Sequence, residues 1–203
     1  MSLTIEFFFD LGNPDTYLCL RSLPAIEGRI GGVFALEPVF LEGMIKGTTN
    51  SWRIDALASI SGKFAYDRLE TARFARHHGL DEFQHNPFFP INTSLIMRGA
   101  YAARKLGIFD PYIDTVATAM WERQLDMGNL TVFATALHEA GLPAADIYRE
   151  SQHEEVKHEL AAATHLLVDR GGSSTPTFFV GDEMFAGKDR LPDVEGTFLK
   201  QAA

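Results

Sequence analysis

The chain has 203 residues, 46% of them hydrophobic, and a formal net charge of -9. This is enough for one compact unit with a sizeable core, and the negative charge argues against a nucleic-acid backbone or an anionic membrane as the main partner. The single cysteine, Cys19, excludes a disulfide framework and a Cys-x-x-Cys redox motif within the chain.

The first element is a strand over residues 3–10. Glu6 and Asp10 interrupt its apolar run, and no basic segment precedes an apolar stretch, so the pattern does not predict a signal peptide. No apolar run in the chain is long enough to span a membrane. We therefore expect a cytoplasmic protein.

The strand runs directly into a helix over residues 14–29. Gly12 allows an awkward backbone angle, Asn13 is a typical N-cap, and Pro14 stands at the favoured first helical position. Free N–H groups and the positive end of the helix dipole can bind a carboxylate, a phosphate or a thiolate there. The alternative is a well-made helix start without chemistry. Cys19 lies in an apolar run and is interpreted as part of the core.

A second strand is predicted over residues 33–40, and the helix between the two strands implies that they pair in parallel. From about residue 41 the pattern becomes helical. Helices are predicted over 66–75, 93–106, 111–125 and 129–140, and one or two more over 144–170, with Gly79 and Gly141 as stops.

Near the other end, residues 173–191 read as a proline-led strand entry, a Gly181-Asp182 turn, a second short strand and the start of a last helix. Proline cannot donate to a strand ladder. Pro176 is therefore expected at an edge or at the beginning of the strand, or in a cis bond at a site.

The strands thus stand at both ends of the chain with helices between them. This order is that of an α/β thioredoxin unit interrupted by an all-α insertion. We predict a thioredoxin-like domain from residues 1–42 and 166–203 and a helical insertion over residues 43–165. A ligand site is expected where the two blocks meet, because clefts between domains commonly bind ligands.

Three motifs occur in order: Phe-Asp-x-x-x-Pro-x-x-Tyr at the start, Phe-Pro-Ile-Asn-Thr in the middle, and Pro-Thr-Phe followed by Gly-Lys-Asp-Arg-Leu near the end. Together they resemble the 2-hydroxychromene-2-carboxylate isomerases and the related kappa-class glutathione transferases. These families belong to the DsbA-like branch of the thioredoxin fold, so the resemblance implies a DsbA-like fold over nearly the whole chain.

The resemblance also implies glutathione as cofactor. In these families a thiolate at the start of the first helix adds to a conjugated double bond, bond rotation follows, and elimination returns the thiol. A serine just before the proline of the first motif holds the sulfur. Here that position is Asn13, whose amide can also donate a hydrogen bond.

Further site residues follow from the resemblance. Pro176 corresponds to the structural cis-proline of the families, and the backbone of Thr175 before it would bind the cysteinyl part of glutathione. Lys188 and Asp189 would contact the γ-glutamyl end of glutathione. The alternatives are an ordinary strand start for Thr175 and helix capping for Asp189.

Three positions in the helical block complete the prediction. Asn50 and Lys63 match an Asn and a Lys that face glutathione in the families, although by residue type they are a turn residue and a solvated charge. Asn92 is expected to cap the following helix, with Thr93 as competitor, and to border the substrate pocket.

No metal site is predicted from the seven histidines. His153 and His158 lack the His-Glu-x-x-His spacing. No Gly-x-Ser-x-Gly elbow supports a serine hydrolase.

The leading hypothesis is a glutathione-dependent isomerase of an aromatic carboxylic acid. Within the same class, the alternative is a kappa-type transferase or peroxidase. A second class is a non-catalytic glutathione-binding protein in which Asn13 records the loss of chemistry. The resemblance and the apolar positions expected on several helices suggest a homodimer.

Overall fold

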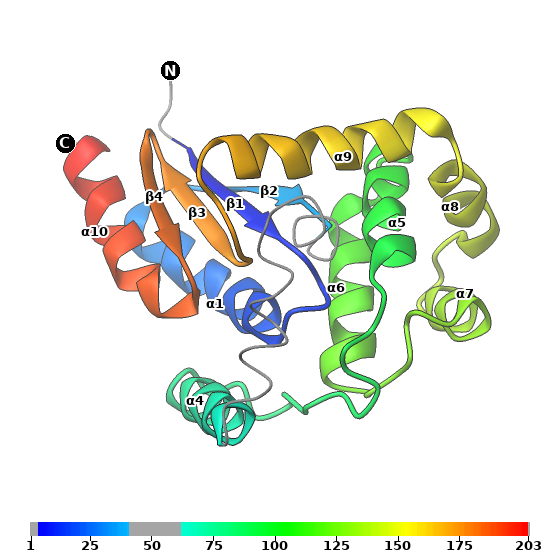
Figure 1. The fold of residues 1–203 in the computed structure, drawn as a ribbon, viewed down its shortest axis with the longest axis horizontal. Coiled ribbons are helices and arrows are strands. Elements are labelled where there is room, and N and C mark those ends of the chain that lie inside the picture. The colour runs from blue at the N-terminus through cyan, green and yellow to red at the C-terminus, as the bar shows by residue number, and fades with distance from the viewer. Residues whose placement is uncertain (1–3, 41–61, 203) are drawn as a thin grey trace.

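The structure is a computed structural model that describes residues 4–40 and 62–202 (Figure 1). Its sheet consists of β1 (Ile5–Phe9), β2 (Phe34–Pro38), β3 (Thr177–Val180) and β4 (Glu183–Ala186), in the order β2-β1-β3-β4. β1 pairs in parallel with β2 and antiparallel with β3, and β4 pairs antiparallel with β3. The predicted parallel pair and the predicted hairpin are both confirmed.

The other regular elements of the described chain are helices. They are α1 (Pro14–Ile30), α4 (Lys63–His77), α5 (Ser94–Lys105), α6 (Phe109–Trp121), α7 (Leu130–Glu139), α8 (Ala144–Ser151), α9 (Glu154–Asp169), the 3-10 helix η1 (Lys188–Arg190) and α10 (Leu191–Ala202). The region 144–170 contains two helices, α8 and α9. The order strand, helix, strand, helical block, hairpin and helix is the predicted one.

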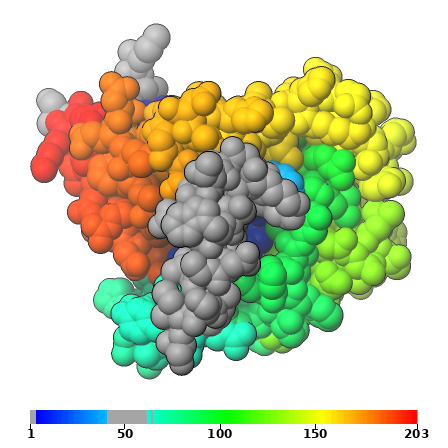
Figure 2. Space-filling view, in the orientation of Figure 1, coloured from blue at the N-terminus to red at the C-terminus, as the bar shows by residue number. Residues whose placement is uncertain are grey.

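The sheet is covered on both faces (Figure 1). α1 and α10 pack together on one face, where Phe7 stacks on Phe178 with ring centroids 4.6 Å apart. α9 crosses the other side, and Arg170 at its end lies 3.6 Å above the Phe179 ring. Figure 2 shows α9 in continuous contact with the hairpin at one end and with α8 at the other. One hydrophobic core joins residues of the sheet and of the helical block.

The bounds of α6 and α4 differ most from the sequence prediction. α6 was predicted over 111–125 but runs from Phe109 to Trp121, because a proline such as Pro111 fits within a first turn. The helix ends at Trp121 with Glu122 as its C-cap, and the left-handed φ of 56° at Gln124 prevents the helix from continuing to residue 125. α4 begins at Lys63, three residues before the predicted start.

No described helix is long and apolar enough to cross a membrane. The predicted division into two domains stays a prediction, and its first boundary, between residues 42 and 43, lies outside the described residues.

Candidate functional site

The turn between β1 and α1 brings Asn13 and Thr175 together. Asn13 has extended backbone angles and caps α1, with its side-chain oxygen accepting the Asp15 N–H at 2.9 Å. Its amide nitrogen donates to the carbonyl oxygen of Thr175, 162 positions away in the sequence. The Thr175–Pro176 bond is cis. Asn13 therefore joins the start of α1 to the cis-proline loop through the two ends of one side chain.

The backbone donors of this turn are already used inside the protein. Each N–H from residue 11 to residue 16 has a partner, apart from Pro14, which has no N–H. The pairs are Leu11 N–H to Met97 Sδ, Gly12 N–H to Asp10 Oδ1, Asn13 N–H to Asp10 O, Asp15 N–H to Asn13 Oδ1 and Thr16 N–H to Asn13 O. The prediction of free N–H groups at this helix start is therefore wrong, because the turn and the cap satisfy them.

Two favourable features for an anion remain at the start of α1. The dipole of a 17-residue helix points its positive end there. Within the described residues, only one of the two amide hydrogens of Asn13 has a partner, the Thr175 oxygen.

Gly12 is required by packing rather than by its backbone angle. Its φ is not among the positive values, so the expected awkward angle is not found. A Cβ at this position would lie 2.3 Å from Cγ2 of Thr93 at the start of α5. The Thr93 hydroxyl donates at 3.0 Å to the buried Asp10, whose other carboxylate oxygen accepts the Gly12 N–H. The helical block thus packs directly against the turn.

Trp121 makes a second connection between the helical block and the turn. Its buried indole N–H donates at 2.8 Å to the carbonyl oxygen of Leu11. Sequence reasoning did not identify Trp121, because nothing in its local pattern distinguishes it from an ordinary core residue. Asp10 had a signal, since it belongs to the first motif.

Lys188 forms a buried charge cluster beside the start of α1. The residue is 6% exposed, and its ammonium lies 3.5 Å from Asp15 and 3.4 Å from Asp189. Phe74 of α4 presents its ring 5.9 Å away. Burial alone lowers the pKa of Lys188, but the two carboxylates outweigh it, so the pKa lies above its ordinary value. Lys188 is therefore a cation already paired with two carboxylates.

Burial raises the pKa of the Asp15 carboxyl, while the Lys188 charge acts in the opposite direction. Burial also raises the pKa of the Cys19 thiol well above its usual range. Cys19 is fully buried in α1, as predicted, and its thiol is held in the neutral, unreactive form.

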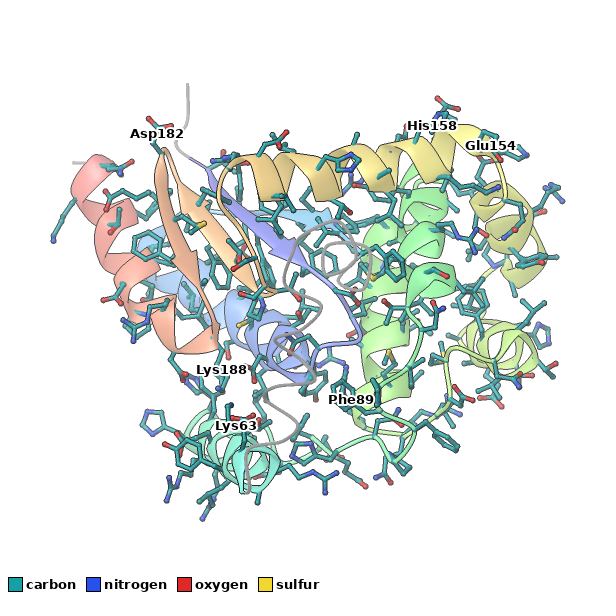
Figure 3. The ribbon with its side chains drawn as sticks, viewed as in Figure 1. Lys63, Phe89, Glu154, His158, Asp182 and Lys188 are labelled. Carbon is teal, nitrogen blue, oxygen red and sulfur yellow. The ribbon has the colours of Figure 1, made fainter. Side chains whose placement is uncertain are left out.

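Of the remaining predicted residues, two are described and one lies outside the described chain. Lys63 pairs with Asp67 on its own helix, and Figure 3 shows it below Lys188. Asn92 is exposed and its side-chain oxygen accepts the Ser94 N–H at 3.0 Å, but the N-cap of α5 is the competitor, Thr93, and Asn92 stands one residue before it. Asn50 lies outside the described residues.

Three buried side-chain polar atoms in the described part of the chain have no hydrogen-bond partner. They are Thr16 Oγ1, Thr175 Oγ1 and His85 Nε2. Thr16 is in the first turn of α1 and Thr175 is bonded to Asn13. Burial is the largest cause that lowers the pKa of His85, and the positive charge of Arg68 is the next. The negative charge of Asp15 acts in the opposite direction and raises this pKa. Buried polar groups are normally paired, so these three atoms are exceptions in the described part of the chain.

No described group of three or more His, Cys, Asp or Glu residues is arranged to hold a metal ion.

Comparison with known protein families matches residues 4–198 to the DSBA-like thioredoxin domain. No curated protein sequence matches the chain. Among solved structures, a 2-hydroxychromene-2-carboxylate isomerase superposes with a TM-score of 0.81 at 20% identity, covering 98% of this chain and 96% of that one.

Two other similar structures are oxidoreductases. The cytosolic disulfide reductase DsbM from Pseudomonas aeruginosa, solved with GSH, gives a TM-score of 0.64 at 17% identity, with 98% of both chains covered. The oxidoreductase DsbA from Xylella fastidiosa gives 0.60 at 14% identity, covering 98% of this chain and 87% of that one. At these identities the likenesses show the fold alone, and they confirm the predicted DsbA-like thioredoxin fold.

Proposed function

The chain belongs to the DSBA-like thioredoxin domain family, and from this we propose that it is a glutathione-dependent isomerase of the 2-hydroxychromene-2-carboxylate isomerase type. The observation that carries the proposal is the Asn13 side chain, which joins the start of α1 to the cis-proline loop. The Asn13 side chain lies where the helix dipole favours negative charge. Its second amide hydrogen supports a role as the donor that holds a ligand sulfur. The proposed substrate is a conjugated aromatic carboxylic acid.

The sulfur has to come from outside the chain. Cys19 is the only cysteine, and it is buried inside α1 with a raised pKa. Glutathione, when bound, supplies a thiol that adds reversibly to a conjugated double bond and so permits rotation about that bond. A family member with no dithiol of its own is better suited to this chemistry than to disulfide exchange.

The residues present fit glutathione. Thr175 stands directly before the cis-proline, where its backbone N–H would bind the cysteinyl part of glutathione. The exposed carboxylate of Asp189 suits an ammonium group. Lys188 keeps Asp15 and Asp189 in place and offsets their charge, which would otherwise repel a thiolate at the start of α1.

One observation favours a second candidate, a glutathione-binding protein without catalysis. The N–H groups of residues 11–16 are satisfied within the protein, so a thiolate at this site has fewer donors than a helix start usually offers. A kappa-type transferase or peroxidase would use the same residues with a different electrophile.

The first test is a calorimetric titration with reduced glutathione and with S-methylglutathione. The free thiol should bind more tightly, and its affinity should rise with pH up to the thiol pKa near 8.5, because binding as a thiolate releases a proton. The affinity of the methylated form should not change with pH over that range. Failure of both forms to bind would refute the proposal.

Substitution of Asn13 assigns the effect to this side chain. Asn13→Ala should reduce the preference for the free thiol about tenfold, a change of about 1.4 kcal/mol. The matched control is Asn129→Ala, which removes the side-chain cap of α7 at a helix start away from the site. It should cost about 1 kcal/mol of stability and leave the thiol preference unchanged. An equal loss in both variants would show that Asn13 acts only as a cap.

Asn13→Ser separates the two candidate functions, with turnover of an unsaturated aromatic acid as the readout. Unchanged or lower turnover would support Asn13 as a working residue of an isomerase. Strongly raised turnover would instead favour the second candidate, in which asparagine marks lost catalysis.

A further inference from the structure

Phe89 is an exposed aromatic residue one side chain away from the candidate site. It is 48% exposed and lies in the loop between α4 and α5. Its ring centroid is 6.1 Å from that of Trp121, whose indole N–H bonds to Leu11 in the β1–α1 turn. Figure 3 shows Phe89 below the start of α1, with Lys188 on the other side of that helix start.

The loop that presents Phe89 is held by the buried side chain of Asn86. The two amide hydrogens of Asn86 are donated to the carbonyl oxygens of Met120 and Leu125, at 2.9 and 2.8 Å. Its side-chain oxygen accepts the Phe88 N–H at 2.9 Å, and its carbonyl oxygen accepts the Phe89 N–H at 3.2 Å. The polar groups of Asn86 thus tie the loop to the end of α6. Such a support fixes an exposed ring in place, as a preorganised binding surface requires.

Phe89 also ends a series of rings that runs along the start of α1. Tyr17 lies 5.6 Å from Phe83, and Phe83 is stacked with Trp121 at 6.1 Å and an interplanar angle of 23°. We name these four residues, Tyr17, Phe83, Trp121 and Phe89, the aromatic wall. Tyr17, Phe83 and Trp121 are buried or half-buried, so Phe89 presents the exposed end of the wall. An aromatic ligand placed there would extend the series by offset or edge-to-face packing.

We propose that Phe89 is the surface on which the aromatic ring of the substrate packs, and that it determines the preference of the site for a planar, conjugated acid. The proposal rests on the proposed function, because it takes the start of α1 as the place of reaction. Asn13 and Phe89 then act on different parts of the reacting pair. Asn13 holds the sulfur, and Phe89 orients the ring that carries the double bond.

The experiment titrates trans-cinnamate, a planar aromatic acid, and 3-cyclohexylpropanoate, a saturated acid of similar length, by calorimetry. The wild type should bind trans-cinnamate at least tenfold more tightly. Phe89→Ala should weaken trans-cinnamate binding about tenfold, and Phe89→Tyr should retain it. Phe88→Ala is the matched control, because Phe88 is an exposed phenylalanine in the same loop whose ring has no ring contact in the described part of the chain.

Three results would overturn the proposal: no binding of trans-cinnamate to the wild type, equal binding of the two acids, or equal losses in Phe88→Ala and Phe89→Ala. Circular dichroism and melting curves of each variant show whether a loss comes from unfolding, and retained binding by Phe89→Tyr separates packing from fold. Reduced glutathione is titrated into the same proteins. If it fails to bind the wild type, the proposed function fails, while the trans-cinnamate series still decides the role of Phe89.

Discussion

The side chain of Asn13 combines hydrogen bonds that a serine side chain could not make in the same way. Its oxygen caps α1 through the Asp15 N–H, and one amide hydrogen holds the Thr175 carbonyl oxygen. The other amide hydrogen has no partner among the described residues and is the one proposed to bind a ligand sulfur. A serine oxygen could still accept the Asp15 N–H as a cap, but a hydroxyl has a single hydrogen, so bridging to the cis-proline loop and donating to a sulfur would compete. The departure from the family serine is therefore compatible with catalysis.

Cys19 provides a prediction at the same scale. Because its thiol is fully buried and its pKa is raised, it should not react with Ellman's reagent in the native protein at neutral pH. In guanidinium chloride one thiol per chain should react rapidly. Fast reaction of the folded protein would contradict this burial. Cys19→Ala should also retain the glutathione affinity of the wild type, which would show that the ligand thiol is not exchanged with the protein.

The turn between β1 and α1 owes its shape to an element that is distant in the sequence. α5 places the Thr93 methyl against Gly12 and the Thr93 hydroxyl against Asp10. α6 contributes the Trp121 contact to Leu11. The helical block therefore positions the residues of the candidate site as well as bordering it.

Gly12→Ala tests this packing. The new Cβ would meet the Thr93 methyl at 2.3 Å, so we expect a loss of about 1–3 kcal/mol of unfolding free energy, measured by urea denaturation, together with weaker glutathione binding. Thr93→Ser removes that methyl but keeps the hydroxyl that bonds to Asp10. The double variant should therefore recover much of the loss.

Gly28→Ala in α1 is the control for Gly12→Ala, because nothing lies within 4 Å of its added Cβ. It should be neutral or stabilise α1 by about 0.5–1 kcal/mol, since alanine is the better helix former. Additive losses in the Gly12→Ala, Thr93→Ser double variant would show that the two residues do not oppose each other as the structure indicates.

Across the described residues, a hydrophobic core extends from the sheet into the helical block. The buried rings of Phe7 and Phe178 in the sheet and of Tyr112 and Trp121 in α6 belong to the same cluster. A break between the two predicted domains would expose apolar surface on both of them. The site at their junction therefore depends on the integrity of both blocks.

We expect the chain to unfold in a single transition. Urea curves followed by circular dichroism at 222 nm, which reports mainly the helices, and by tryptophan fluorescence in a Trp52→Phe variant, which then reports only Trp121, should coincide. Two separated midpoints would contradict the shared core and favour independent domains.

The sequence by itself determined the order of the elements and the start of α1. Alternating or continuous apolar runs, the Asn13-Pro14 cap and the glycine stops depend on neighbouring residues, and local rules describe them well. Helix ends were less accurate, as at α6, because Gln124 adopts a left-handed angle that glycine or asparagine would have signalled and glutamine does not.

Only the tertiary structure decided how the site is built. The bridge from Asn13 to Thr175 and the pairing of Lys188 with Asp15 join residues more than 160 positions apart. The Thr175–Pro176 bond at the end of that bridge is cis, one of the alternatives that the residue pattern had left open. The satisfied N–H groups, the Thr93 methyl on Gly12 and the exposed Phe89 beside Trp121 likewise depend on packing between elements. Local sequence patterns predict which residues begin a helix, but contacts across the fold determine which of their donors and charges remain for a ligand.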